Sequence, residues 1–190
     1  MLATPQPLES TLEGAKHLFR FREGDIFYAA AGPQGAQPIL LLHSTHLSAS
    51  SFEWRRNFSA LSQEFRVYAP DLLGFGLSDR PALDYSANTY VTFISDFVRE
   101  VIGRPVMIVA RGQSAAFSTR AAYLDPPLFS RLVLISPTGI AVGAAEDQAD
   151  QDGPIEALRG VLRRVSGTTA GEVPYALLTT KSALSIFVAR

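Results

Sequence analysis

The fold of this chain is decided by one stretch, Val106-Met107-Ile108-Val109-Ala110-Arg111-Gly112-Gln113-Ser114-Ala115. It begins with an apolar run typical of a strand that is buried on both faces of a sheet. A turn of small residues follows, and the alanine-rich sequence beyond it predicts a helix that extends to Leu124. A strand, a sharp turn and a helix in this order raise one side chain above the end of the strand, where a small molecule can reach it.

Other apolar runs predict the strands that surround this unit. Residues 38–42, 66–70 and 132–135 are short, largely apolar and bounded by turn residues, as expected of buried strands. Residues 18–22 and 25–30 alternate between apolar and polar and are separated by a Glu-Gly pair, which predicts a hairpin. Because strands alternate with helices, we expect an α/β fold with a mainly parallel sheet, an N-terminal antiparallel hairpin and helices on both faces.

Two helices are predicted between these strands. Ser50-Ser51-Phe52-Glu53 matches a capping box, Ser-x-x-Glu, in which the serine and the glutamate cap the first turn of a helix. Apolar residues that recur every three or four positions predict another helix over residues 87–102.

The chain divides into three predicted parts. Residues 1–15 form a polar leader, and residues 16–140 carry the strands and helices of the α/β core. Residues 141–190 contain an acidic loop and then two helical stretches, the first of which begins at Pro154, a favoured residue for the first helical position. We expect this last part to be a partial helical lid rather than another strand–helix unit.

Composition excludes several classes of function. The net charge of −1 does not favour nucleic acid or an acidic membrane surface as a partner. The absence of cysteine excludes disulfides and thiolate metal sites, and the sequence predicts no metal and no cofactor. The N-terminal residues lack the pattern of a signal peptide, and no apolar run reaches the roughly 20 residues of a membrane span. We therefore expect a cytoplasmic protein.

Five motifs follow one another between residues 17 and 140. They are an apolar strand that ends in His43, Glu53-Trp54-Arg55, Asp71-x-x-Gly74-x-Gly76-x-Ser78-Asp79-Arg80-Pro81, the turn around Gly112, and Leu132-Val133-Leu134-Ile135-Ser136-Pro137. In this order they resemble the α/β-hydrolase superfamily, and within it the capped branch that holds esterases, haloalkane dehalogenases and epoxide hydrolases. The resemblance implies that the turn is a nucleophile elbow and that the reaction class is hydrolysis of an ester-type bond in a small apolar substrate.

Two residues compete for the apex of this elbow, the position of the nucleophile. Gly112 at the apex keeps the preceding strand at ordinary length and has small neighbours, Ala110 and Ser114. Counting from the flanking motifs also places Gly112 where relatives carry their nucleophile. Ser114 remains the alternative catalytic residue, since it too has small neighbours, Gly112 and Ala116.

The remaining catalytic groups of the superfamily are a histidine base and an acid that follow the nucleophile in the chain. The only histidines are His17, His43 and His46, all upstream of the elbow. The resemblance gives His43 a structural role beside the oxyanion loop, and His46 lies near the mouth of the site. Ser44, Thr45, Gly112 and the backbone N–H of Gln113 are left as candidate oxyanion or substrate-binding groups.

These observations predict a hydrolase scaffold that is truncated or catalytically incomplete. In the first interpretation the chain is the N-terminal portion of a capped hydrolase and lacks the final strands, so that residues 132–135 form an exposed sheet edge through which the chain could self-associate. In the second, the chain is a non-catalytic protein that binds a small apolar molecule or a partner. A third interpretation is a minimal hydrolase that uses Ser114 with His43 or His46.

Overall fold

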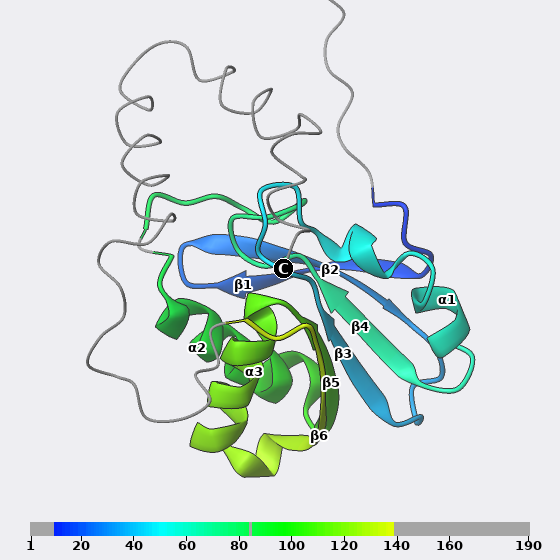
Figure 1. Ribbon diagram of the computed structural model, residues 1–190. Coiled ribbons are helices and arrows are strands. Elements are labelled where there is room, and N and C mark those ends of the chain that lie inside the picture. The colour runs from blue at the N-terminus through cyan, green and yellow to red at the C-terminus, as the bar shows by residue number, and fades with distance from the viewer. Residues whose placement is uncertain (1–9, 84, 139–190) are drawn as a thin grey trace, which may run out of the picture. The chain divides into compact units, whose positions relative to one another are not determined.

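A computed structural model describes residues 10–83 and 85–138 and shows a mixed sheet of six strands (Figure 1). In chain order the strands are β1 (Ala15–Phe21), β2 (Gly24–Ala31), β3 (Pro38–Leu42), β4 (Arg66–Pro70), β5 (Val106–Arg111) and β6 (Phe129–Ile135). In space their order is β1-β2-β4-β3-β5-β6. The first nine residues of the predicted leader and the predicted lid over 141–190 lie outside the described residues.

The direction of the strands confirms the predicted fold class. β1 and β2 form an antiparallel hairpin, and β2 is also antiparallel to β4. β4, β3, β5 and β6 are parallel to one another, so the carboxyl ends of these four strands lie at one end of the sheet. The loops that follow β3, β4 and β5 therefore meet at this end, which is where ligands bind in open α/β sheets.

Alternate residues of the central strands point to opposite faces of the sheet. In β3, Leu40 and Leu42 belong to one buried cluster, while Ile39 and Leu41 belong to another. All four side chains are at most 2% exposed, which explains why β3 is apolar along its whole length. The sheet is thus covered on both faces.

Different helices cover the two faces (Figure 1). α2 (Ala87–Phe97), which continues as a π-helical turn over Val98–Ile102, and α3 (Gln113–Leu124) pack together on the face of the first cluster. The short helix α1 (Phe58–Leu61) contributes Phe58 to the second cluster on the other face. The chain between α3 and β6 forms a single 3₁₀ turn, Pro126–Leu128. None of the helices in the described ranges is long and apolar enough to span a bilayer.

The predicted capping box at Ser50 is wrong in its details. The Ser50 hydroxyl accepts from the N–H of Phe52, and only a 3₁₀ turn, Ser51–Trp54, forms before the chain reaches α1. The Glu53 carboxylate does not return to the start of this turn. It points across to the loop after β3, where Ser44 binds both of its oxygens.

Candidate functional site

Gly112 occupies the turn between β5 and α3. Its φ of 61° and ψ of −129° lie in a backbone region that glycine tolerates and that residues with a Cβ rarely adopt. Its N–H donates to the carbonyl of Ile135 at 3.0 Å, and its carbonyl accepts from the N–H of Thr138 at 3.3 Å. The turn is therefore tied to the end of β6 and held in one conformation.

Ser114 lies in the first turn of α3 and faces the sheet. It is fully buried, and its hydroxyl donates to the carbonyl of His43 at 2.6 Å. Ser118, one helical turn further on, is also buried and donates to the carbonyl of Ser114 at 2.7 Å. The Ser114 hydroxyl thus binds α3 to the residue after β3, and the Ser118 hydroxyl bonds within the helix. Neither hydroxyl is exposed at the turn.

Glu53 lies at the centre of the polar contacts beside the turn. Its Oε1 accepts from the Ser44 hydroxyl at 2.5 Å and lies 2.9 Å from Nε2 of His46. Its Oε2 accepts from the Ser44 N–H at 3.2 Å and from Nη1 of Arg111 at 3.4 Å. The carboxylate thus joins the loop after β3 to the last residue of β5.

These contacts keep Glu53 ionised. Burial alone would raise the pKa of its carboxyl, because the side chain is only 12% exposed. The two hydrogen bonds from Ser44, with the nearby positive charge of Arg111, outweigh burial and hold the pKa below the ordinary value of 4.5. Arg111 itself is half exposed and reaches Glu53 with one nitrogen.

His43 follows β3 directly and is buried at the same end of the sheet, where it has a structural role. It is fully buried, its Nε2 accepts from the N–H of Leu72 at 2.9 Å, and its Nδ1 lies 2.5 Å from the carbonyl of Ser44. With Nε2 as acceptor, the ring proton is on Nδ1 and donates to Ser44. Burial lowers the pKa of His43 below 6.5, so the ring is neutral and links the loops after β3 and β4.

The candidate oxyanion groups lie on both sides of the turn. Thr45 donates its hydroxyl to Oε1 of Gln113 at 2.9 Å, which joins the loop after β3 to the start of α3. The N–H of Gln113 belongs to the first turn of this helix, where N–H groups have no partner within the helix. The Ser44 N–H, by contrast, is bound to Glu53.

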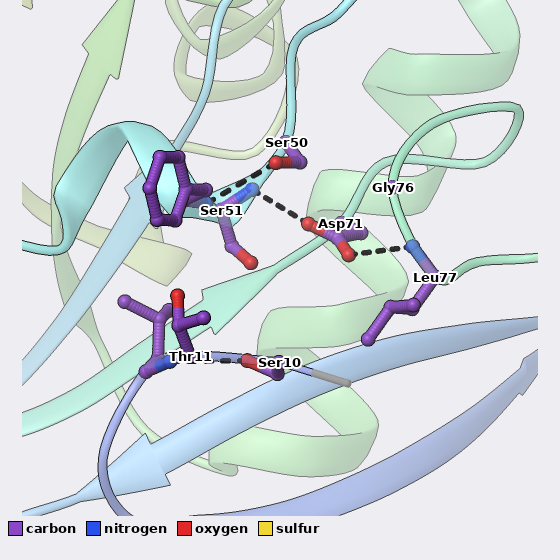
Figure 2. A pocket seen from close by; sticks show the side chains of 9 residues that line it. Ser10, Thr11, Ser50, Ser51, Asp71, Gly76 and Leu77 are labelled. Carbon is purple, nitrogen blue, oxygen red and sulfur yellow. Dashed lines mark hydrogen bonds between the residues drawn. The ribbon is translucent and has the colours of Figure 1, made fainter. Parts of the chain in front are cut away.

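A separate pocket of about 200 Å³ lies beside the loop after β4 (Figure 2). Figure 2 shows the Asp71 carboxylate between Ser51 and Leu77, whose N–H groups it accepts at 2.6 Å and 2.8 Å. A Cβ on Gly76 would come within 2.1 Å of this carboxylate, so glycine is needed for the close approach. Asp71 thus organises the glycine turn and is occupied by backbone groups, and the pocket offers little further chemistry.

The structure brings most of the predicted site residues together. Ser44, Thr45, Gly112 and Gln113 share the end of the sheet where β3 and β5 terminate. His17 lies on β1, stacked on Tyr28 with 5.0 Å between the ring centres, far along the sheet order from β5. No group of His, Asp and Glu side chains suited to a metal ion occurs in the part of the chain that the structure describes.

Sequence reasoning missed Glu53 as a site residue. The Ser-x-x-Glu spacing placed it in a helix cap, and that spacing carries no sign that the carboxylate bonds to a loop nine residues earlier. Only the tertiary contact with Ser44, His46 and Arg111 reveals its position.

Comparison with known proteins agrees with this architecture. The family model described as "Alpha/beta hydrolase family" matches residues 39–187. An alpha/beta hydrolase fold protein from Burkholderia ambifaria is similar in structure, with a TM-score of 0.68 and 28% identity over 85% of this chain and 56% of that one.

Two curated relatives are similar in sequence. An uncharacterized protein of Mycobacterium tuberculosis is 33% identical over 139 residues, which cover 73% of this chain and 37% of that protein. The 2-hydroxy-6-oxo-6-(2'-aminophenyl)hexa-2,4-dienoic acid hydrolase of Metapseudomonas resinovorans is 30% identical over 122 residues, which cover 63% of this chain and 41% of that enzyme. The chain therefore spans about two fifths of the length of these relatives. The sheet order, the strand–turn–helix at Gly112 and the family match together show that this chain belongs to the alpha/beta hydrolase family.

Proposed function

We propose that this chain is an ester-type hydrolase scaffold that binds a small apolar molecule above Gly112 and forms no covalent acyl intermediate at the elbow. The observation that carries the proposal is Gly112 itself. It stands at the turn where the family presents its nucleophile, and it has no side chain with which to attack a carbonyl carbon.

The environment of the nearby hydroxyl groups supports the same proposal. Ser114 is fully buried and bonded to the carbonyl of His43. The Ser44 hydroxyl donates to Glu53, a carboxylate whose lowered pKa makes it a weak base. Neither serine hydroxyl is hydrogen-bonded to a histidine ring in the part of the chain that the structure describes.

The chemical class of the ligand is inferred from the surrounding groups and from relatives. The N–H of Gln113, in the first turn of α3, can donate a hydrogen bond to the carbonyl oxygen of a ligand above Gly112. The Metapseudomonas relative is named a hydrolase of a small organic acid, which is consistent with a small organic ligand. We therefore propose a neutral, ester-like molecule as the ligand.

Binding can be tested with 2-heptanone, an uncharged ketone with the shape of a short ester. In an amide NMR titration of the full 190-residue chain, we expect shifts to concentrate at residues 44–46 and 111–115. Gly112→Ala should weaken these shifts by filling the space above the turn. Gly103→Ala is the matched control, because Gly103 also has a positive φ but follows the π-helical turn Val98–Ile102, before β5 begins. Absence of shifts at the turn would contradict the proposal.

The edge strand favours a second candidate role, binding of another protein chain. Within the described residues β6 pairs with β5, and its Val133 and Ile135 side chains are 40% and 38% exposed. An exposed apolar edge can pair with a strand of another molecule. We propose a second copy of the chain as the partner, and we expect sedimentation to show self-association that Val133→Lys reduces and Leu124→Lys, at an exposed position on α3, leaves unchanged.

A further inference from the structure

We infer that His46, oriented by Glu53, is a general base that activates a water molecule above Gly112, so that the scaffold hydrolyses esters directly. This inference rests on the proposed function, because the ester must first bind above the turn. It adds a catalytic residue, His46, and a positioning residue, Glu53, on the loop after β3 and on the 3₁₀ turn Ser51–Trp54.

Of the three histidines in the chain, His46 alone has the surroundings of a base. His43 is fully buried with both ring nitrogens engaged. His17 lies on β1 against Tyr28, with no carboxylate bonded to it in the described structure. The His46 side chain is 55% exposed, and its Nε2 is 2.9 Å from the carboxylate of Glu53.

The hydrogen bond to Glu53 sets the tautomer of His46. Because Glu53 is ionised and accepts, Nε2 donates to it, and Nδ1 is the ring nitrogen that can take up a proton from water. The Ser48 hydroxyl lies 3.4 Å from Nδ1, at the long limit of a hydrogen bond, so a water molecule can compete for this nitrogen. A carboxylate that orients a histidine in this way stays ionised throughout catalysis.

The loop that carries His46 is held against the turn by three contacts. Thr45 bonds to Gln113, and Glu53 links Ser44 to Arg111. The third is steric, because Ser44 Cβ is 3.3 Å from the place of a Cβ on Gly112. The histidine therefore follows directly on the residues that flank the turn.

The reaction that this arrangement supports balances without a covalent intermediate. Water gives a proton to Nδ1 of His46, and its oxygen forms a bond to the carbonyl carbon of the ester. The N–H of Gln113 at the start of α3 stabilises the negative oxygen that develops. The carbon–oxygen bond to the alcohol then breaks, and the alcohol takes the proton from His46, which regenerates the neutral ring and releases acid and alcohol.

Steady-state hydrolysis of p-nitrophenyl butyrate by the full chain tests the inference. We expect His46→Gln to lower kcat/KM about 100-fold, within the usual range for a general base, and to leave the binding of 2-heptanone unchanged. His17→Gln is the control histidine and should keep the full rate, since His17 is exposed on β1. Equal rates for the unchanged chain and His46→Gln would overturn the inference.

Glu53 is tested by its separate effects on kcat and KM. Glu53→Gln should lower kcat about tenfold and leave KM unchanged, because Glu53 orients the ring of His46 and does not contact the ester. Glu53→Asp should restore part of the rate. An unchanged kcat in Glu53→Gln would show that Glu53 has no part in the mechanism.

The two proposals fail in different ways. Binding of 2-heptanone at the turn, with hydrolysis that does not depend on His46, would overturn the general base and leave the proposed function intact. Absence of binding would overturn the proposed function, and the inference with it. A burst of one equivalent of p-nitrophenol would reveal a covalent intermediate and contradict both.

Discussion

Ser44 Cβ lies 3.3 Å from the position that a Cβ on Gly112 would occupy. The side chain of Ser44 and the glycine at position 112 therefore meet in space. Glu53 holds the Ser44 side chain in this place through its hydroxyl.

Gly112→Ala is predicted to destabilise the fold. The positive φ alone costs a residue with a Cβ roughly 1–3 kcal/mol, and the contact with Ser44 adds to this. Gly103→Ala is the matched comparison, because Gly103 has a φ of 71° and nothing within 4 Å of its Cβ position. Urea denaturation should show the larger loss for Gly112→Ala, and equal losses would contradict the steric account.

Replacing Ser44 by glycine should change the cost of Gly112→Ala. The loss caused by Gly112→Ala is predicted to be smaller in a Ser44→Gly background, because the contact at 3.3 Å is gone while the backbone strain remains. The coupling energy from the four proteins of this cycle measures the steric part directly. A coupling energy of zero would show that the two positions are independent.

The sequence predicted the sheet better than the site. The apolar runs at β3 and β5 are enough to predict these two strands, because a strand buried on both faces must be apolar along its whole length. The strained turn could also be predicted, since a small-residue turn between a strand and a helix favours glycine at its apex. The role of Glu53 could not be predicted, because it depends on where the loop after β3 lies relative to the 3₁₀ turn, and no local pattern fixes that distance.

Acidification should release the contact that Glu53 makes with Ser44. The pKa of Glu53 is lowered by folding, so its contribution to stability is present above 4.5 and is lost as the pH falls through the folded value. We expect Glu53→Gln to flatten the loss of stability that the unchanged chain shows below pH 4.5. Glu64→Gln, at an exposed position, is the control. Identical acid profiles for Glu53→Gln and the unchanged chain would contradict this account.

His43 should control stability at a higher pH. Its folded pKa is below 6.5, so the unfolded chain binds a proton before the folded chain does, and stability falls as the pH drops from 6.5. One such group contributes at most about 1.4 kcal/mol per pH unit. His43→Gln should remove this slope below pH 6.5, whereas His17→Gln should preserve it. If the pH dependence of stability persists in His43→Gln, another titratable group causes it.

Ser114→Ala is predicted to leave ester hydrolysis unchanged. The Ser114 hydroxyl is buried and bonded to the carbonyl of His43, so its loss should cost about 1–3 kcal/mol of stability and no activity. Ser118→Ala is the matched control, since this serine is equally buried one turn further along α3. Kinetics with p-nitrophenyl butyrate compare the two, and a drop confined to Ser114→Ala would make Ser114 a catalytic residue.

The most direct test of the central claim is the mass of the intact chain after incubation with an excess of a fluorophosphonate, a reagent that modifies activated serine nucleophiles. The account predicts an unchanged mass, because Gly112 presents no hydroxyl at the elbow and Ser114 is buried. An adduct of one equivalent, mapped by peptide sequencing to Ser114, would show that the elbow carries a working nucleophile and would contradict the account.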